Sequence, residues 1–467
     1  MRRDPPQGVP GRAEPNRHNL RRRLPLTSCS PPILLPMNPL SHDADTTVIT
    51  LPNGVRVLAI ALPHLASVNV SVFVRTGSHH ESRRLNGISH VVEHMAFKGT
   101  HGRTCQQINL DAERLGADVN AHTDKDHTAY HMRGLAQHAG VFVQMLGDIV
   151  RNSTFPEAEL ERERQVILHE YTEDEDDALT QGYKLFDRLC FGSHAAAQPV
   201  IGVRANIERF TRQDLLDYVQ QRYSAPNVIV AVAGPVDPQA IAREAEAAFG
   251  TMASGPVNRV TAPHWVGGLR THRQAGCSQT HVVLGFPAPA LRSQPQAAIV
   301  AAAVLGEGMS SPLLDTLRER RGLAYYAACS TDITEIAGQF MVEASTSAEH
   351  LDDFFDEVGQ LLRTQAERIQ PIDLERARNQ LAMRGLRNFE RPQRRLESAA
   401  LDLYVFGHVR SRAEWQAGID AVSADQVRTE FARLIGSPVA VAIAGKVPAR
   451  AKERALERLA VLGGRPA

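Results

Sequence analysis

The chain has 467 residues, which is more than one hydrophobic core usually accommodates and enough for two or three domains. Hydrophobic residues make up 43% and charged residues 22%, as in soluble globular proteins. The 52 Lys and Arg residues balance the 52 Asp and Glu residues, and this neutrality argues against binding to nucleic acid or anionic membranes through overall charge.

The five cysteines are scattered, and no two of them form a Cys-x-x-Cys pair. This pattern suits a reducing compartment, so we expect a cytoplasmic protein, with the organelle matrix and the periplasm as less favoured alternatives. The longest apolar runs, residues 228–233 and 297–305, fall well short of the roughly 20 residues that span a membrane, so no membrane span is predicted.

Residues 1–44 are rich in Pro and Arg and contain no long apolar run, so a secretory signal is not predicted. Their arginines would suit a transit peptide, but their prolines oppose the amphipathic helix that such a peptide needs. The segment is interpreted as a disordered leader, with Met37 as an alternative start.

The first half, residues 45–251, mixes strand and helix patterns. Alternating or β-branched runs predict strands at residues 47–60, 67–75, 123–132 and 228–233. Apolar residues at helical spacing predict helices at residues 87–97, 104–115, 137–151, 156–172 and 212–223. Hairpin-like strands beside runs of helix indicate an α+β fold with a largely antiparallel sheet.

One predicted helix carries the segment His90-Val-Val-Glu93-His94. Residues four apart lie one above the other on a helix, so both imidazoles can reach one metal ion. Glu93 lies on the same side but is displaced around the axis, where it can face a water molecule without binding the metal. Imidazole suits zinc, and a catalytic zinc keeps one coordination position open for water.

A third ligand is needed, and the predicted helix 156–172 offers Glu170. Glu163 lies two turns earlier on the same face, where it could support a ligand or handle protons. Two His and one Glu form a known catalytic zinc set. His169 is an alternative third ligand beside Glu170.

The chain contains an internal repeat. The segment from Ser224 to Gly234 resembles the segment that ends at Gly445, 211 residues later, and both place a Pro before an apolar run ending in Ala-Gly. We therefore predict two tandem homologous domains, 45–251 and 271–467, joined by a Gly- and Pro-containing linker at 252–270. The same offset carries the two histidines onto Ala301 and Leu305, so one zinc site per chain is expected.

The order His-x-x-Glu-His is the inverted zinc motif, and residues 86–100, NGISHVVEHMAFKGT, closely resemble the pitrilysin family, within it the processing-peptidase-like branch. The resemblance continues through residues 115–123, 161–170 and 223–228, and reappears at 305–325. Glu170 follows His94 by 76 residues, which matches the spacing of the third ligand in the family.

The resemblance implies a zinc metalloendopeptidase in which His90, His94 and Glu170 bind zinc and Glu93 activates the water. It further implies that Glu163 is an additional active-site carboxylate and that Arg318 and Tyr325 hold the substrate and the tetrahedral intermediate. Asn120 and Ala121 would lie on an edge strand that pairs with the substrate backbone.

The resemblance also implies that each chain forms half of a clam-shell chamber, since short members of the family must pair. A homodimer, or a heterodimer with an inactive homologous subunit, is therefore expected. Two other functions stay open at this stage: a catalytically dead structural subunit, and a peptide-binding module that holds zinc but seldom cleaves. The physiological substrate is not specified by these patterns.

Overall fold

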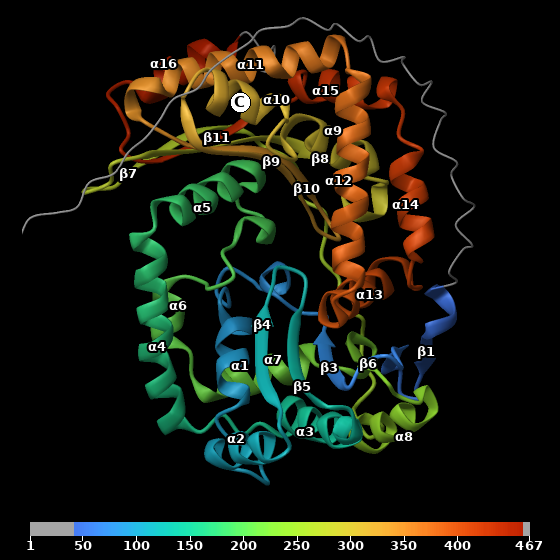
Figure 1. Cartoon of the computed structure of the whole chain (residues 1–467). Helices are drawn as coiled ribbons and strands as arrows, with labels where there is room; N and C mark the ends of the chain where they lie inside the picture. Colours follow the sequence, from blue (N-terminus) through green and yellow to red (C-terminus); the bar gives the residue numbers. More distant parts are fainter. Residues whose placement is uncertain (1–41, 461–467) are drawn as a thin grey trace, which may run out of the picture. The chain divides into compact units, whose positions relative to one another are not determined.

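The structure is a computed structural model that describes residues 42–460, and most of the predicted leader lies outside them. The described residues fold into two sheets with covering helices, one sheet from each half of the chain (Figure 1). This α+β arrangement confirms the predicted fold class.

The first sheet has the strand order β1-β2-β6-β3-β5-β4, so β4 forms one of its edges. All neighbouring pairs are antiparallel except β2 and β6. The strands are β1 (Thr46–Thr50), β2 (Arg56–Ala61), β3 (Ser67–Val74), β4 (Asp118–Thr123), β5 (Thr128–Leu135) and β6 (Val228–Gly234).

Two strand predictions were wrong in detail. The segment 47–60 forms two antiparallel strands because the chain reverses at Gly54, whose φ of 102° suits a glycine in a turn. The segment 123–132 crosses the turn between β4 and β5. In both cases, strand propensity identified the residues that form strands but did not identify the polar turn between them.

The second sheet repeats the first without its outer strand, in the order β7-β11-β8-β10-β9. Here β7 and β11 form the parallel pair, in the places of β2 and β6. The strands are β7 (Gly268–Arg273), β8 (Thr280–Ala288), β9 (Ala324–Ile333), β10 (Gly338–Thr346) and β11 (Ala440–Gly445). Strand β7 begins inside the predicted linker.

The five helices predicted in the first half are present as α1, α2, α3, α4 and α7, and the structure adds α5, α6 and α8. Their bounds are α1 (Ile88–Ala96), α2 (Cys105–Arg114), α3 (Ala139–Asn152), α4 (Glu157–Asp176), α5 (Ala178–Phe191), α6 (Arg204–Arg209), α7 (Arg212–Arg222) and α8 (Pro238–Phe249).

The second half places helices at matching positions, with α9 in the place of α1. They are α9 (Gln296–Gly306), α10 (Pro312–Leu314), the π-helical η7 (Asp315–Arg320), α11 (Leu351–Glu367), α12 (Pro371–Phe389), α13 (Pro392–Phe406), α14 (Arg412–Asp420), α15 (Ala424–Ile435) and α16 (Ala451–Leu459). Within residues 42–460, no helix has the length and apolar character to cross a membrane.

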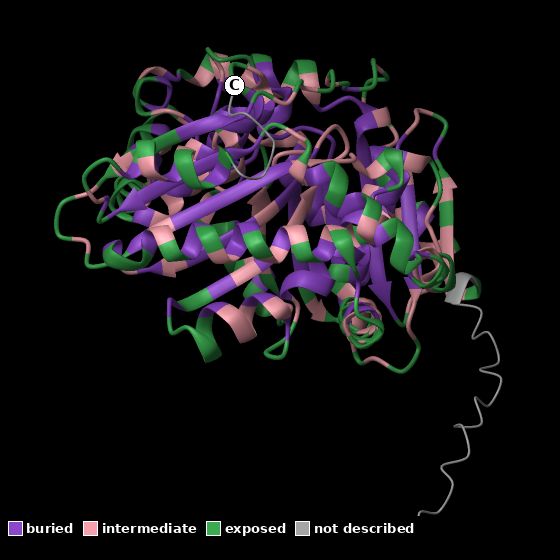
Figure 2. Cartoon of the chain, turned by 90° about the horizontal axis from the view of Figure 1, so that it is seen from above, coloured by how far each residue is buried: buried purple, intermediate pink, exposed green. Residues whose placement is uncertain are grey.

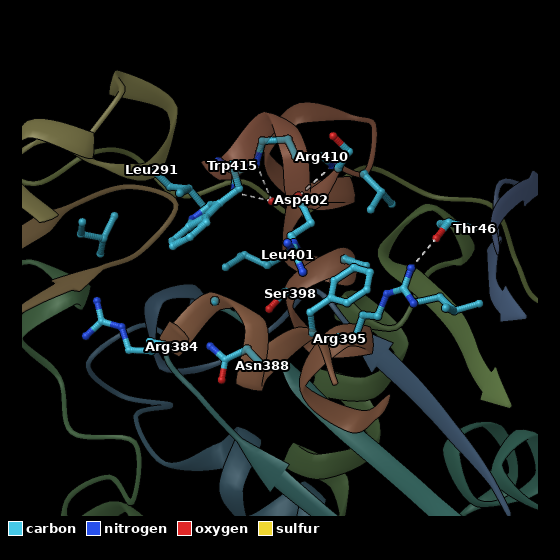
Figure 3. Close-up of a pocket in the computed structure, with 18 residues that line it drawn as sticks. Thr46, Leu291, Arg384, Asn388, Arg395, Ser398, Leu401, Asp402, Arg410 and Trp415 are labelled. Carbon is cyan, nitrogen blue, oxygen red and sulfur yellow. Dashed lines mark hydrogen bonds and ion pairs between the residues drawn. The ribbon is translucent and has the colours of Figure 1, made fainter. Parts of the chain in front are cut away.

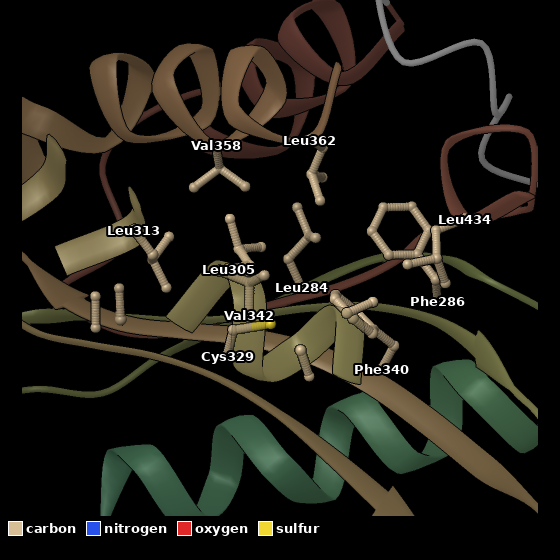
Figure 4. Close-up of a cluster of buried hydrophobic side chains, with 14 of the residues drawn as sticks. Leu284, Phe286, Leu305, Leu313, Cys329, Phe340, Val342, Val358, Leu362 and Leu434 are labelled. Atoms are coloured by element: carbon tan, nitrogen blue, oxygen red, sulfur yellow. The ribbon is translucent and has the colours of Figure 1, made fainter. Parts of the chain in front are cut away.

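Each half has its own apolar core between a sheet and its helices, and the strands form the most buried layer (Figure 2). In the second half, Leu305 of α9, Val358 of α11 and Phe340 of β10 pack together (Figure 4). The fold therefore buries α9, the counterpart of the metal-motif helix, inside a core.

The two halves exchange one helix each. Helix α13 of the second half covers the first sheet, where Leu396 and Leu403 join a core with Phe73. Helix α5 of the first half covers the second sheet, where Phe186 packs with Val283. Figure 1 shows both helices beside the sheet of the other half. Because of this exchange, apolar burial binds the two halves to each other.

Candidate metal centre

Helix α1 carries His90, Glu93 and His94, and its opposite face packs into the first core through Val91 and Met95. Core packing therefore fixes the rotation of the helix and turns the two histidines away from the core. The two imidazole centroids are 4.6 Å apart. This is the adjacency that their spacing in the sequence predicts.

Helix α4 brings Glu170 to both histidines. Its Oε2 lies 3.8 Å from Nε2 of His90 and 3.6 Å from Nε2 of His94. One ligand atom from each of the three residues lies within 4.8 Å of the other two. Donors at about 2.0–2.2 Å from a tetrahedral zinc lie roughly 3.4 Å apart, so this set fits one zinc ion with small adjustments.

Burial, followed by the nearby His94, lowers the pKa of His90 to about 3. A neutral imidazole is the form that binds a metal. Nδ1 of His90 is buried and has no hydrogen-bond partner within the described residues. The donor chemistry is thus that of a His₂Glu zinc site.

Glu163 supports this cluster from α4. Its Oε2 lies 3.2 Å from Nδ1 of His94, and its Oε1 lies 2.6 Å from Nζ of Lys98. A carboxylate that accepts the Nδ1 proton of a histidine leaves Nε2 with its lone pair free. Glu163 thereby orients the nitrogen of His94 that faces Glu170.

Glu93 is held by the edge strand. Oγ1 of Thr123, the last residue of β4, donates to Oε2 of Glu93 at 2.7 Å. Burial raises the pKa of Glu93, and the Thr123 hydroxyl and His94 oppose that shift. The Glu93 carboxylate thus has a defined orientation, and nothing in the sequence pattern had marked Thr123.

The start of α1 is anchored by Glu81, another residue that the sequence did not reveal. Its two carboxylate oxygens accept the backbone N–H groups of Gly87 and Ser89, both at 2.8 Å. Gly87 has a φ of 99°, and a Cβ there would lie 2.8 Å from Cα of Gly202. The helix therefore starts at a fixed place, which also fixes His90 two residues into it.

A cavity of about 610 Å³ lies beside the cluster and is lined by His90, Glu93, Glu170 and Ala121. Asn120 and Ala121 lie on β4, which is an edge of the first sheet, as the resemblance implied. Oδ1 of Asn120 accepts the N–H of Ala121 at 2.8 Å. The cavity and the unpaired side of β4 are therefore adjacent.

Arg318 and Tyr325 lie apart from this cavity, on η7 and at the start of β9. The Arg318 guanidinium stacks 5.6 Å from the ring centroid of Tyr325, whose residue surface is 82% exposed. Neither residue lines the cavity beside the metal ligands. His169 also points away, since its side chain is 76% exposed and lies beside Glu173.

A second cavity, of about 260 Å³, lies among α12, α13 and α14 (Figure 3). Trp415 and Asn388 line it, and Asp402 binds Arg410 at its wall. None of the predicted site residues lies there. The metal centre is therefore served by the first cavity.

Comparison with known proteins identifies the family of the chain. Residues 56–185 match the family described as insulinase (peptidase family M16), and residues 209–381 match the peptidase M16 inactive domain. An uncharacterized zinc protease of Rickettsia bellii is 30% identical over 401 residues, which cover 85% of this chain and 97% of that protein. The chain belongs to peptidase family M16. The pitrilysin-type resemblance of the His90 segment is thereby confirmed.

Other M16 relatives differ in their names. Cytochrome b-c1 complex subunit 1 of Rattus norvegicus is 27% identical over 86% of this chain and 88% of that protein, and its name describes a subunit of an assembly. A protease from Helicobacter pylori shares the fold, with a TM-score of 0.78 at 21% identity over 85% of this chain and 98% of that chain. Family membership thus supports a zinc peptidase and leaves its substrate unassigned.

Proposed function

We propose that this M16 protein is a zinc-dependent metalloendopeptidase that cleaves peptides or unfolded segments bound as an extended strand. The observation that carries the proposal is the meeting of His90, His94 and Glu170 within 4.8 Å, with Glu93 on the same helix as the two histidines. A catalytically dead subunit has no need to retain all four groups in this arrangement.

When bound, zinc supplies a water molecule of lowered pKa and polarises the scissile carbonyl. Glu93 accepts the proton of the attacking water and delivers it to the leaving amine. Thr123 holds Oε2 of Glu93, which leaves Oε1 to face the cavity. Glu163 keeps His94 in the tautomer that offers Nε2 to the metal.

The substrate adds a strand to the free edge of β4 beside Asn120 and Ala121. Among residues 42–460, β4 pairs only with β5, so the backbone groups on its other side are available. Strand addition reads the backbone more than the side chains, which suits varied peptides that can extend. This mode of binding places the scissile bond next to Glu93.

The proposed enzyme works as a pair of chains in the cytoplasm, either as a homodimer or with an inactive homologous subunit. Arg318 and Tyr325 do not line the cavity of their own chain, and Tyr325 is largely exposed. We assign them to the site of a second chain, where Tyr325 would donate a hydrogen bond to the oxyanion.

The decisive experiment measures zinc per chain and cleavage of a mixed-peptide library for the wild type and for Glu93→Gln. We expect about one zinc per chain in both proteins and cleavage only in the wild type. Glu113→Gln, an exposed change on α2, serves as the matched control and should cleave normally. Zinc without cleavage in the wild type would favour a subunit role, and absence of zinc would overturn the site.

Mixing tests the shared site. Glu93→Gln and Tyr325→Phe chains should each be inactive alone and should regain about a quarter of the wild-type activity when mixed. Half of the dimers then contain one chain of each variant, and each of these dimers has one intact site out of two. Gel filtration of an active monomer would contradict the pairing.

A further inference from the structure

The hairpin of β4 and β5 ends in a turn, residues 124–127, that lies directly after Thr123. Thr123 is the residue that holds Glu93, so the position of this turn affects the orientation of the proposed base. Strand β4 has a neighbour on one side only, and its own sheet therefore restrains it less than an inner strand.

Lys125, in this turn, contacts both α5 of its own half and β9 of the other half. Its Nζ lies 3.0 Å from Oδ2 of Asp187 on α5 and 3.5 Å from Oδ2 of Asp332 on β9. Nε2 of Gln339, on β10, donates to the other oxygen of Asp187 at 2.9 Å. The side chain of Lys125 is only 18% exposed.

Electrostatics keep this contact charged. Burial opposes the ammonium of Lys125, but the carboxylates of Asp187 and Asp332 outweigh it and raise the pKa of the lysine. The pair with Asp187, in which both side chains are 18% exposed, is screened less by solvent than a surface pair, whereas the Asp332 side chain is 43% exposed. The turn therefore has a firm attachment to α5 and β9.

Asp126 makes a second attachment beside the first. Its Oδ1 lies 2.9 Å from Nδ1 of His79, and its Oδ2 accepts the backbone N–H of Glu335 at 3.0 Å. Glu335, in the turn between β9 and β10, also pairs with Arg75. The two repeat-related hairpin turns, 124–127 and 334–337, thus contact each other through the Asp126 carboxylate and the backbone of Glu335.

We propose that Lys125 is a positioning residue for the peptidase site: it connects the edge strand that holds Glu93 to the second half of the chain, directly through Asp332 and indirectly through Asp187, to which Gln339 also binds. The half that matches the inactive domain then serves the zinc site of its own chain. The inference rests on the proposed function for its catalytic consequence. The attachment of the β4–β5 hairpin to the second half rests on the observed contacts alone.

A purely structural role is the competing explanation, because these contacts also join the two halves. The chain offers a matched control in Arg395 of α13, whose Nη2 lies 2.6 Å from Oδ1 of Asp45. That pair also links the two halves, with side chains 8% and 24% exposed, and Asp45 directly precedes β1, which forms the opposite edge of the first sheet from β4. Asp45→Asn therefore weakens a link between the halves without changing the contacts of Lys125.

The test is a double-mutant cycle between Lys125→Met and Thr123→Val. Each change alone should lower kcat by about tenfold or more, because a shift of about 1 Å in a catalytic group costs on the order of a hundredfold. In the Thr123→Val background, Lys125→Met should lower kcat little further. Asp332→Asn, which leaves Asp187 to pair with Lys125, is a milder variant should Lys125→Met fold poorly.

Hydrogen exchange supplies a readout that needs no activity. In Lys125→Met and Asp332→Asn, the β5-bonded amides of β4 should exchange at least about threefold faster than in the wild type, whereas in Asp45→Asn they should not. Additive losses of kcat, or unchanged exchange in β4, would overturn the proposal. A wild type without peptidase activity would contradict the proposed function. The hydrogen-exchange measurement would still decide whether Lys125 attaches the β4–β5 hairpin to the second half.

Discussion

Glu163→Gln tests how the metal centre is oriented. Glu163 accepts from Nδ1 of His94 with one oxygen and pairs with Lys98 through the other. An amide has one oxygen and one NH₂ group, so glutamine must turn its NH₂ either toward the Nδ1–H of His94 or toward the Lys98 ammonium. In each orientation a donor faces a donor, and the glutamine also lacks the negative charge.

The expected loss of zinc affinity follows from the role of residues that orient a metal ligand. Removing a residue that orients a metal-bound histidine weakens metal affinity by about 10–100-fold, which corresponds to about 1.4–2.7 kcal/mol. Glu163 has only 11% of its side chain exposed, so solvent screens this interaction little. Competition between the apo chain and a fluorescent zinc chelator measures the dissociation constant directly.

Glu161→Gln is the matched control, because Glu161 lies on the same helix with a side chain that is 68% exposed and paired with Arg164. It should bind zinc as the wild type does. Circular dichroism would verify that both variants are folded. Equal zinc affinity in Glu163→Gln and Glu161→Gln would refute the reasoning that Glu163 sets the tautomer of His94.

Four further substitutions probe the ligand set, the helix anchor and the exchanged helix. His169→Ala should leave zinc content unchanged, whereas His94→Ala should lose the ion, as measured by elemental analysis, since His169 points to solvent. Glu81→Ala leaves the first N–H groups of α1 without acceptors and should lower the free energy of unfolding by about 1–3 kcal/mol in urea titrations; no change would show that water replaces the carboxylate. Leu403→Ala empties a buried position between α13 and the first sheet and should cost about 2–5 kcal/mol in the same assay, and a value near zero would contradict the observed packing.

The sequence revealed the parts of the molecule that follow from local periodicity. The four-residue spacing of His90 and His94 needs only a helix to become adjacency, and α1 provides it. The 211-residue repeat predicted two homologous domains, and it extends further than the matched segments, since β2 and β7 also occupy the same place in their sheets. Even Glu170, which is distant in sequence from His90 and His94, could be predicted from the ligand spacing in the family.

Contacts between the halves were not predictable in the same way. Helices α5 and α13 each cover the sheet of the other half, and an amphipathic pattern says which face of a helix is buried but not which sheet buries it. Glu81 and Lys125 look like ordinary surface charges in the sequence. Only the fold shows that one accepts the first amides of α1 and that the other bridges to Asp187.

The repeat explains how one half could lose its ligands without losing its place in the molecule. In the first half, α1 keeps a polar face toward α4 and an apolar face toward the core. In the second half, α9 carries Ala301 and Leu305 at the corresponding positions, and both are fully buried. With Ala301 and Leu305 at these positions, α9 is a core helix where α1 is amphipathic. On the proposal above, the half without ligands supports the zinc site through packing and charge, since it supplies α13, which covers the first sheet, and the carboxylate of Asp332, which pairs with Lys125.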